Sequence, residues 1–196
     1  FPFHPDYATS DATDPQLDPA RYYEGLSRFF DIVEARSGLP IVIAAHPRAR
    51  YDELPNCFGD RSVEQYKTAE LVAQATLVIA HDSRSINFAI MFRKPITFLT
   101  SDDLQETVYG PMISNFAEAM GKTPINVDRE IDLDMDREMV VDEKRYDRYL
   151  EDYIKVPGTP EKPFWEILAD RVEADYFGGG AAVHAERGVR PAIGSE

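Results

Sequence analysis

The sequence has little of several residue types and patterns that carry well-known chemistry. Cys57 is its one cysteine, which excludes an intrachain disulfide framework and any multi-cysteine zinc site and fits a reducing compartment. There is no GxGxxG dinucleotide fingerprint and no HExxH zinc motif. The apolar runs fall far short of the ~20 residues of a membrane-spanning helix. We therefore expect no metal, no cofactor and no membrane span, and we expect the protein in the cytoplasm.

The sequence also has no initiating methionine and no targeting signal at its beginning. The 196 residues begin at Phe1, with no Met and no charged-then-apolar targeting pattern. We expect the chain to be the interior of a longer protein. Its composition, with 43% hydrophobic and 11% aromatic residues, is that of a globular protein able to bury a substantial core.

Positive charge is scarce outside one segment. Thirty-five acidic residues against 21 Lys and Arg give a net charge of −14, which disfavours binding to nucleic acid or to an anionic membrane surface. Residues 40–100 differ, because they carry six acidic and seven basic residues, whereas 128–152 carry eleven and five. If the chain binds an anion, residues 40–100 are where electrostatics permits it.

The apolar pattern predicts alternating strands and helices. Asp18-Pro19 is typical of a helix start, and apolar residues recur at helical spacing after it. The following elements are expected: a helix at 19–37, a strand at 40–45, a loop at 46–62, a helix at 62–74, and strands at 76–80 and 96–100 around a helix at 86–92. Both 41–45 and 77–80 are typical of strands buried on both faces. This order predicts an α/β fold, a Rossmann-like parallel sheet flanked by helices.

The rest of the chain gives weaker signals. We expect a helix over 102–121 broken near Gly110-Pro111, a short strand at 124–127, and helices at 142–156 and 163–177, while 128–138 has no clear assignment. Five aromatic residues are expected to pack in the helical core: Tyr146, Tyr149, Tyr153, Phe164 and Trp165. The organisation predicted is a loop or linker at 1–18, a nucleotide-binding domain at 19–156, a helix at 157–177 and a flexible tail at 178–196.

Two polar turns follow consecutive predicted strands. His46-Pro47 comes directly after the first, with Arg48 beside it, and a histidine there can donate to a phosphate or protonate a leaving phosphate, since its ordinary pKa is near 6.5. The alternative is a structural, hydrogen-bonded histidine.

Asp82-Ser83-Arg84-Ser85 follows the next strand and opens a helix, where amides and short hydroxyls suit phosphate. The alternative is plain helix capping by Ser83 or Ser85. Ligands of parallel sheets bind outside the carboxyl ends of the strands, so we expect the two turns to share one phosphate site.

These residues resemble a known group of enzymes. The stretch 41–48 (IVIAAHPR), followed by 77–85 (LVIAHDSRS) and Lys94-Pro95-Ile96, looks like the donor-binding half of GT-B glycosyltransferases with an HP motif and a serine motif. That group includes bacterial sialyltransferases, capsule polymerases and glycerophosphotransferases. The likeness covers about residues 20–127, and 160–165 (PEKPFW) also suggests proteins of surface-carbohydrate biosynthesis.

The resemblance implies roles for particular residues. His46 would contact the donor phosphate and support departure of the nucleotide, and Ser83 and Ser85 would hold the same phosphate, with Arg48 and Arg84 adding positive charge. The acid that deprotonates the acceptor lies in the amino-terminal domain of these enzymes, which this chain lacks. The helix at 86–92 has no glutamate to grip a ribose, unlike the retaining GT-B pattern.

The sequence thus favours the carboxyl-terminal half of an inverting glycosyltransferase of surface polysaccharide biosynthesis, with a nucleotide-activated sugar as substrate and a carbohydrate acceptor. The isolated chain is expected to be inactive without the missing domain. Two alternatives stay open. One is a sugar-nucleotide epimerase-like domain, and the other is a non-catalytic, flavodoxin-like binding or interaction module.

Overall fold

The structure is a computed structural model that describes residues 18–47, 51 and 57–177. Predictions for 1–17, for Arg48 and for the tail 178–196 therefore lie outside the described residues. The chain divides into two compact units between Lys155 and Val156, and each is considered by itself.

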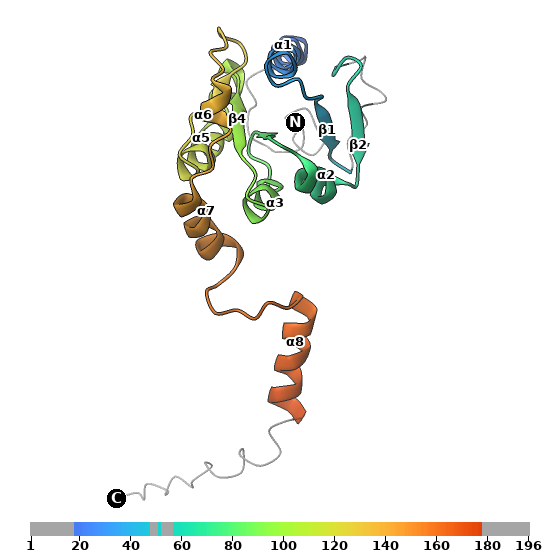
Figure 1. Cartoon of the computed structure of the whole chain (residues 1–196), viewed down its shortest axis with the longest axis vertical. Helices are drawn as coiled ribbons and strands as arrows, with labels where there is room; N and C mark the ends of the chain where they lie inside the picture. Colours follow the sequence, from blue (N-terminus) through green and yellow to red (C-terminus); the bar gives the residue numbers. More distant parts are fainter. Residues whose placement is uncertain (1–17, 48–50, 52–56, 178–196) are drawn as a thin grey trace, which may run out of the picture. The chain divides into compact units, whose positions relative to one another are not determined.

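The first unit is an α/β fold with parallel strands, which confirms the predicted fold class (Figure 1). β1 pairs with β2 in one sheet, and β3, β4 and β5 form a second sheet in that order. In chain order the elements are α1 (Pro19–Ser37), β1 (Val42–Ala45), β2 (Ser62–Gln65), α2 (Thr68–Gln74), β3 (Val78–Ala80), α3 (Ile86–Met91), β4 (Ile96–Thr100), α4 (Asp102–Gln105), α5 (Tyr109–Ala119), β5 (Ile125–Asn126), α6 (Met135–Glu138), α7 (Glu143–Tyr149) and a π-helical turn, η2 (Leu150–Ile154).

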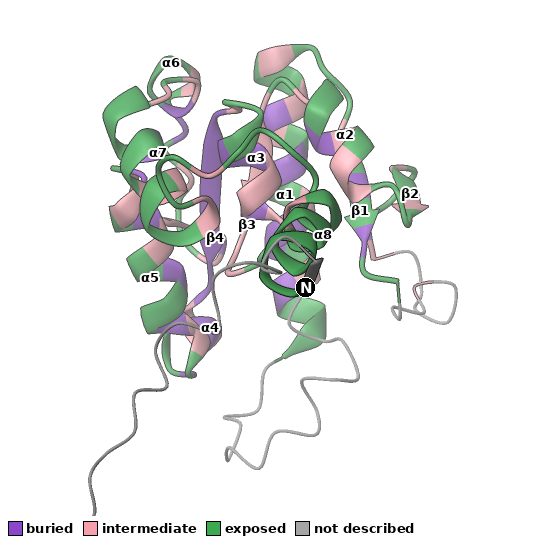
Figure 2. Ribbon diagram, turned by 90° about the horizontal axis from the view of Figure 1, so that it is seen from below, coloured by how far each residue is buried: buried purple, intermediate pink, exposed green. Residues whose placement is uncertain are grey.

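The division into two sheets separates strands that the sequence placed in one. Between the described residues of β1 and β3 there is no hydrogen-bond ladder. β4 is buried along its whole length, whereas β1 alternates, with Val42 and Ala44 exposed and Ile43 and Ala45 buried (Figure 2). The prediction that β1 is buried on both faces is therefore wrong, because one of its faces lacks a cover.

α1 is the long helix that the sequence predicts at 19–37. The Asp18 carboxylate accepts hydrogen bonds from the amides of Ala20 (3.0 Å) and Arg21 (3.3 Å), which caps the amino end. Gly38, at φ 69°, ends the helix in the left-handed conformation that glycine adopts readily. The buried face carries mostly apolar side chains: Tyr22, Leu26, Phe29, Phe30 and Val33.

The helix expected at 62–74 is wrong in its first half. Residues 62–65 form β2, which pairs in parallel register with β1, Val42 opposite Ser62. Tyr66 has a φ of 62°, a left-handed conformation that a helix of L-residues cannot continue. The helix therefore begins only at Thr68.

The break in 102–121 lies earlier than expected, between Gln105 and Tyr109. The Thr107 hydroxyl donates to the carbonyl of Leu104 (2.8 Å) and accepts from the amide of Tyr109 (3.1 Å), which stabilises a turn there. Gly110 belongs to α5, where a Cβ would lie 2.6 Å from the Gln105 carbonyl oxygen. Gly110 therefore allows α4 and α5 to pack closely, and it does not break the helix.

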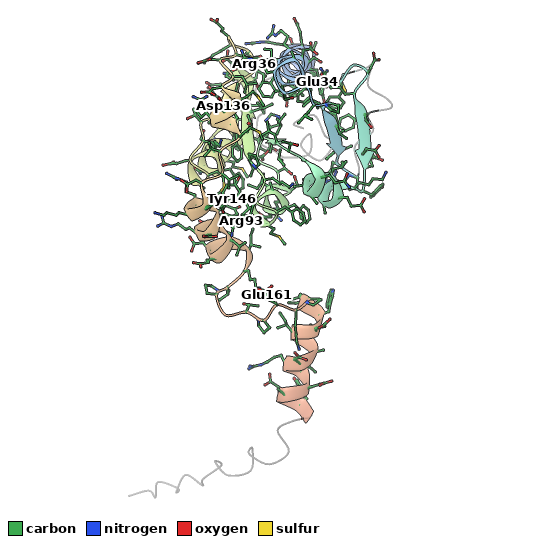
Figure 3. All side chains as sticks on the ribbon, viewed as in Figure 1. Glu34, Arg36, Arg93, Asp136, Tyr146 and Glu161 are labelled. Carbon is green, nitrogen blue, oxygen red and sulfur yellow. The ribbon has the colours of Figure 1, made fainter. Side chains whose placement is uncertain are left out.

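The acidic stretch after β5 packs on the second sheet. α6 ends in Glu138, a buried carboxylate that accepts from the Thr97 hydroxyl at 2.9 Å and lies 3.8 Å from the Lys122 ammonium. α7 is fastened to the connection between α3 and β4, where the Tyr146 hydroxyl donates to the Lys94 carbonyl at 2.8 Å. Arg93 lies near Tyr146 (Figure 3).

The second unit contains, in its described part, α8 (Phe164–Val172) and a π-helical turn, η3 (Glu173–Phe177). Phe164 and Trp165 are 65% and 74% exposed, and Tyr153 of η2 is 73% exposed, so the core role predicted for these three aromatics is wrong. Within the described part of this unit, α8 has no second layer against which to bury an apolar face. Tyr146 is buried as expected.

None of the helices in the described ranges combines the length and the apolar character that crossing a membrane requires.

We predict that Gly25→Ala destabilises the protein although alanine is the better helix former. A Cβ at Gly25 would lie 2.8 Å from the Val127 carbonyl oxygen, so α1 would have to move off the end of β5. Such crowding costs about 1–3 kcal/mol, against a helix-propensity gain of ~1 kcal/mol. Urea unfolding should show a net loss. Ala35→Gly, at an exposed site of α1, calibrates the propensity term, and a Gly25→Ala protein more stable than the parent would contradict the prediction.

Candidate functional site

A cavity of about 1420 Å³ lies between α1, β1, α2, β3 and α3. Its walls are largely apolar, with side chains such as Leu26 and Phe30 of α1 and Val72 of α2. Its polar lining includes both turns singled out in the sequence: His46, His81, Asp82, Ser83, Arg84 and Ser85.

His46 lies at the carboxyl end of β1, on the first sheet, and is exposed at the cavity. Its position follows from the end of the strand at Ala45 and from the turn of the chain at Pro47. The side chain is thus presented at the strand end, where ligands of parallel sheets bind. Arg48, predicted beside it, is outside the described residues.

Ser83, Arg84 and Ser85 lie beyond the carboxyl end of β3, on the second sheet, and line the same cavity. The two serine hydroxyl oxygens are 2.7 Å apart, and Ser83 Oγ also accepts from the Ser85 amide at 3.2 Å. One hydroxyl proton is used in the bond between the serines, so the pair keeps one O–H that can be donated to a ligand. Arg84 is exposed beside them.

The amino end of α3 differs from the expected phosphate cradle. The amides of Ile86, Asn87 and Phe88 donate to the carbonyls of Ser83, Arg84 and Ser85 at 3.0–3.2 Å. Ser85 occupies the cap position without a side-chain bond to the helix, so capping by Ser85 is not observed, while the Ser83 hydroxyl accepts from the Ser85 amide just before the helix. Any anion held here would be bound by the hydroxyls and by Arg84 more than by these three amides.

His81 is a residue that motif reasoning passed over. Its Nδ1 lies 2.7 Å from the Leu99 carbonyl oxygen, so Nδ1 carries the proton and donates it there, and Nε2 accepts from the Tyr22 hydroxyl. Burial lowers the pKa of His81 to about 4. The ring is therefore neutral at pH 7, and it links α1 to β4 instead of serving as an acid. A buried tyrosine 59 residues away gives no sequence signal for this pairing.

Asp82, next along the turn, is half-buried, and burial raises the pKa of its carboxyl. Burial thus makes it easier to protonate when an anion approaches. The carboxyl ends of β4 and β5 are different. There Asp102 accepts from Asn126 and from Arg129, both at 2.8 Å, and these contacts lower the pKa of its carboxyl. Arg21 and Arg129 at those strand ends are already paired with Asp102 and Asp128, so an anion there would compete with carboxylates.

Over residues 18–47, 51 and 57–177, no group of three or more His, Cys, Asp or Glu side chains is arranged to hold a metal ion. The arrangement can offer an imidazole, a hydroxyl pair and a guanidinium on one side and an apolar surface on the other. That combination suits a ligand with an anionic group attached to a flat or apolar body.

Comparison of the chain with protein-family models, with curated proteins and with solved structures gave no match. The predicted site residues therefore rest on the geometry described above.

We predict that His81 makes stability fall with acidification. Its pKa is lower in the folded state than the ordinary 6.5, so the unfolded chain binds the extra proton and folding stability is lost as the pH falls from about 6.5 toward 4. Between pH 7.5 and 5.0 the loss amounts to about 2 kcal/mol. Urea unfolding of the parent and of His81→Gln at both pH values isolates this effect, because all carboxylates are common to both proteins. Equal pH dependence in the two would contradict the assignment.

Proposed function

We propose that this chain is the nucleotide-binding half of an inverting glycosyltransferase that acts, in the cytoplasm, in surface polysaccharide biosynthesis. One observation carries the proposal: His46 and the Ser83–Ser85 turn, 37 residues apart and on different sheets, line one cavity. Fold and cavity alone are shared by many binding proteins, so the proposal depends on this pair of turns and on their likeness to the HP and serine motifs.

The chemistry of the pair fits a donor phosphate. A protonated His46 imidazole can donate to a phosphate oxygen, and the outward hydroxyl of the serine pair can donate to a second oxygen of the same group. Both are stronger interactions with a departing nucleotide, whose phosphate gains charge as the sugar leaves, than with the intact donor. Interactions of that kind accelerate the chemical step.

The proposed reaction is a direct displacement at the anomeric carbon. The acceptor hydroxyl oxygen attacks that carbon, the bond from the carbon to the donor phosphate oxygen breaks, and its electron pair stays on the nucleotide. A general base accepts the acceptor proton, and we place that base in the amino-terminal domain that the resemblance implies. The chain described here would bind the donor, and its partners would be a nucleotide sugar and a carbohydrate acceptor.

The cavity also provides for the remainder of the donor. Apolar side chains of α1, α2 and α3, among them Val33, Leu71 and Phe88, face it. A nucleoside can lie against such a surface while its phosphate meets the polar turns. The surrounding segment 40–100 is the one part of the sequence whose charge does not oppose an anion.

We predict that removing the polar turns weakens nucleotide binding in the full-length protein. His46→Ala and the double variant Ser83→Ala/Ser85→Ala should each reduce the affinity for one of CMP, CDP or UDP by about 10–100-fold, as the loss of charge-assisted hydrogen bonds implies. Isothermal titration calorimetry measures the affinity, and turnover with the matching sugar donor should fall with it.

Ser62→Ala is the matched control, since Ser62 lies on β2 and is exposed. It should bind like the parent. Unchanged affinity and turnover in both test variants would remove His46 and the serines from the site, and a protein that inverts sugar stereochemistry without an acceptor would be an epimerase instead.

A further inference from the structure

Tyr66 is held in a backbone conformation that costs free energy. Its φ is 62°, and among the described non-glycine residues only Arg93 shares a positive φ. A bulky side chain in the left-handed region is strained, and such strain gathers at functional sites. Arg93 has a local explanation, because it follows the end of α3, where the Lys94 amide donates to the Ala89 carbonyl at 2.8 Å. Tyr66 has no explanation of this kind, since it follows a strand and precedes a helix.

Tyr66 lies beside the histidine of the candidate site. β1 and β2 are parallel neighbours, and their last pair is Ala45 opposite Gln65 (Figure 1). The next residues along the two strands are therefore His46 and Tyr66. The Tyr66 hydroxyl donates to the Pro47 carbonyl at 3.3 Å, across a separation of 19 residues. The tyrosine side chain thus reaches the turn that presents His46.

The corner between β2 and α2 places Tyr66 at the mouth of the cavity. Pro47, which accepts the Tyr66 hydrogen bond, lines the cavity, and so does Thr68, two residues further along the chain. Tyr66 itself is 77% exposed. A strained turn between a strand and a helix also exposes the nucleophile of α/β-hydrolases at the top of their sheet. Tyr66 is therefore placed where a ligand leaves the cavity for solvent.

The fold gains little from a tyrosine at this corner. Glycine adopts a positive φ at no steric cost, and asparagine tolerates it. An exposed ring contributes little burial of apolar surface. The hydrogen bond to Pro47 is long and open to solvent, so its contribution to stability is small. The strain at Tyr66 is thus not offset by packing of its side chain.

The proposed function determines which part of a ligand would reach Tyr66, and the inference rests on that function. The donor phosphate is proposed to lie between His46 and the serine pair, and the nucleoside against Leu71 and Phe88 inside the cavity. The remaining part of the donor is the sugar that is transferred. It has to face the open side, because the acceptor must approach it there. Tyr66 lies on that side of His46.

We propose that Tyr66 is a specificity residue that contacts the transferred sugar, with its ring packed against the apolar face of a pyranose. Tyrosine suits this contact because it combines a flat apolar surface with a polar tip. The hydroxyl proton is used on Pro47, so the phenolic oxygen keeps a lone pair that can accept from a sugar hydroxyl. The substrate class is therefore a nucleotide-activated pyranose.

Three substitutions separate the ring, the hydroxyl and the backbone in the full-length protein. Tyr66→Ala and Tyr66→Gly remove the ring equally, but only glycine suits the left-handed backbone. Tyr66→Phe keeps the ring and removes the hydroxyl. Isothermal titration calorimetry measures the binding of two probe pairs, UDP with UDP-glucose and CMP with CMP-N-acetylneuraminate. Ser62→Ala, on the exposed part of β2, is again the control.

We predict a loss that is specific for the sugar. In the probe pair that the parent binds, Tyr66→Ala and Tyr66→Gly should each weaken binding of the sugar nucleotide about 3–10-fold and leave binding of the nucleotide unchanged. Tyr66→Phe should lose less than either. Tyr66→Gly should also melt about 2–4 °C above Tyr66→Ala, because glycine relieves the strained φ. A residue that only stabilises the turn would not give this separation of sugar binding from nucleotide binding.

Two results would overturn the proposal. One is equal binding of the sugar nucleotide by the parent and Tyr66→Ala. The other is an equal loss for the nucleotide and its sugar conjugate, because Tyr66 would then only hold the turn at His46 in place. Failure of the proposed function gives a different result, in which His46→Ala leaves nucleotide binding unchanged. A parent protein that binds none of the four probes would contradict the proposed function and this inference together.

Discussion

α1 bridges two sheets that share no hydrogen-bond ladder in the described chain, and its apolar side chains line the cavity between them. On one side Glu34 accepts from the amide of Ile41 at 2.9 Å, just before β1. On the other side Arg28 donates to the Val127 carbonyl at 3.1 Å, just after β5. Glu34 and Arg36 lie on different sides of the helix (Figure 3). α1 is therefore one link between the two sheets, and the packing of α2 against α3 is a second.

The candidate site inherits this dependence. His46 follows a strand of the first sheet, and Ser83 and Ser85 follow a strand of the second. A phosphate bound by both turns would bridge the two sheets, so its binding free energy would include the cost of holding them at one separation. The Tyr22 to His81 contact, which joins α1 to the second sheet beside the serine turn, is part of that positioning. The cavity thus has two histidines at different positions: His81, which is structural, and His46, which is proposed to bind the ligand.

Local patterns in the sequence predicted those elements that local interactions determine. Asp18-Pro19, the apolar spacing after it and Gly38 define α1 without any tertiary information. β2 could not be predicted in this way, because its four residues contain one apolar side chain, Val63, and it forms only where β1 offers an edge. The division of the sheet and the tautomer of His81 are likewise non-local. They depend on contacts between residues far apart in the chain, which periodicity does not encode.

The candidate phosphate site depends on one coordinate, the separation of the carboxyl ends of β1 and β3. Each binding event has to select the separation at which His46 and the serine pair both reach one phosphate, and the apparent affinity falls by the fraction of molecules that have it. Any ligand that bridges the two turns must, by the same linkage, favour the state in which that separation holds.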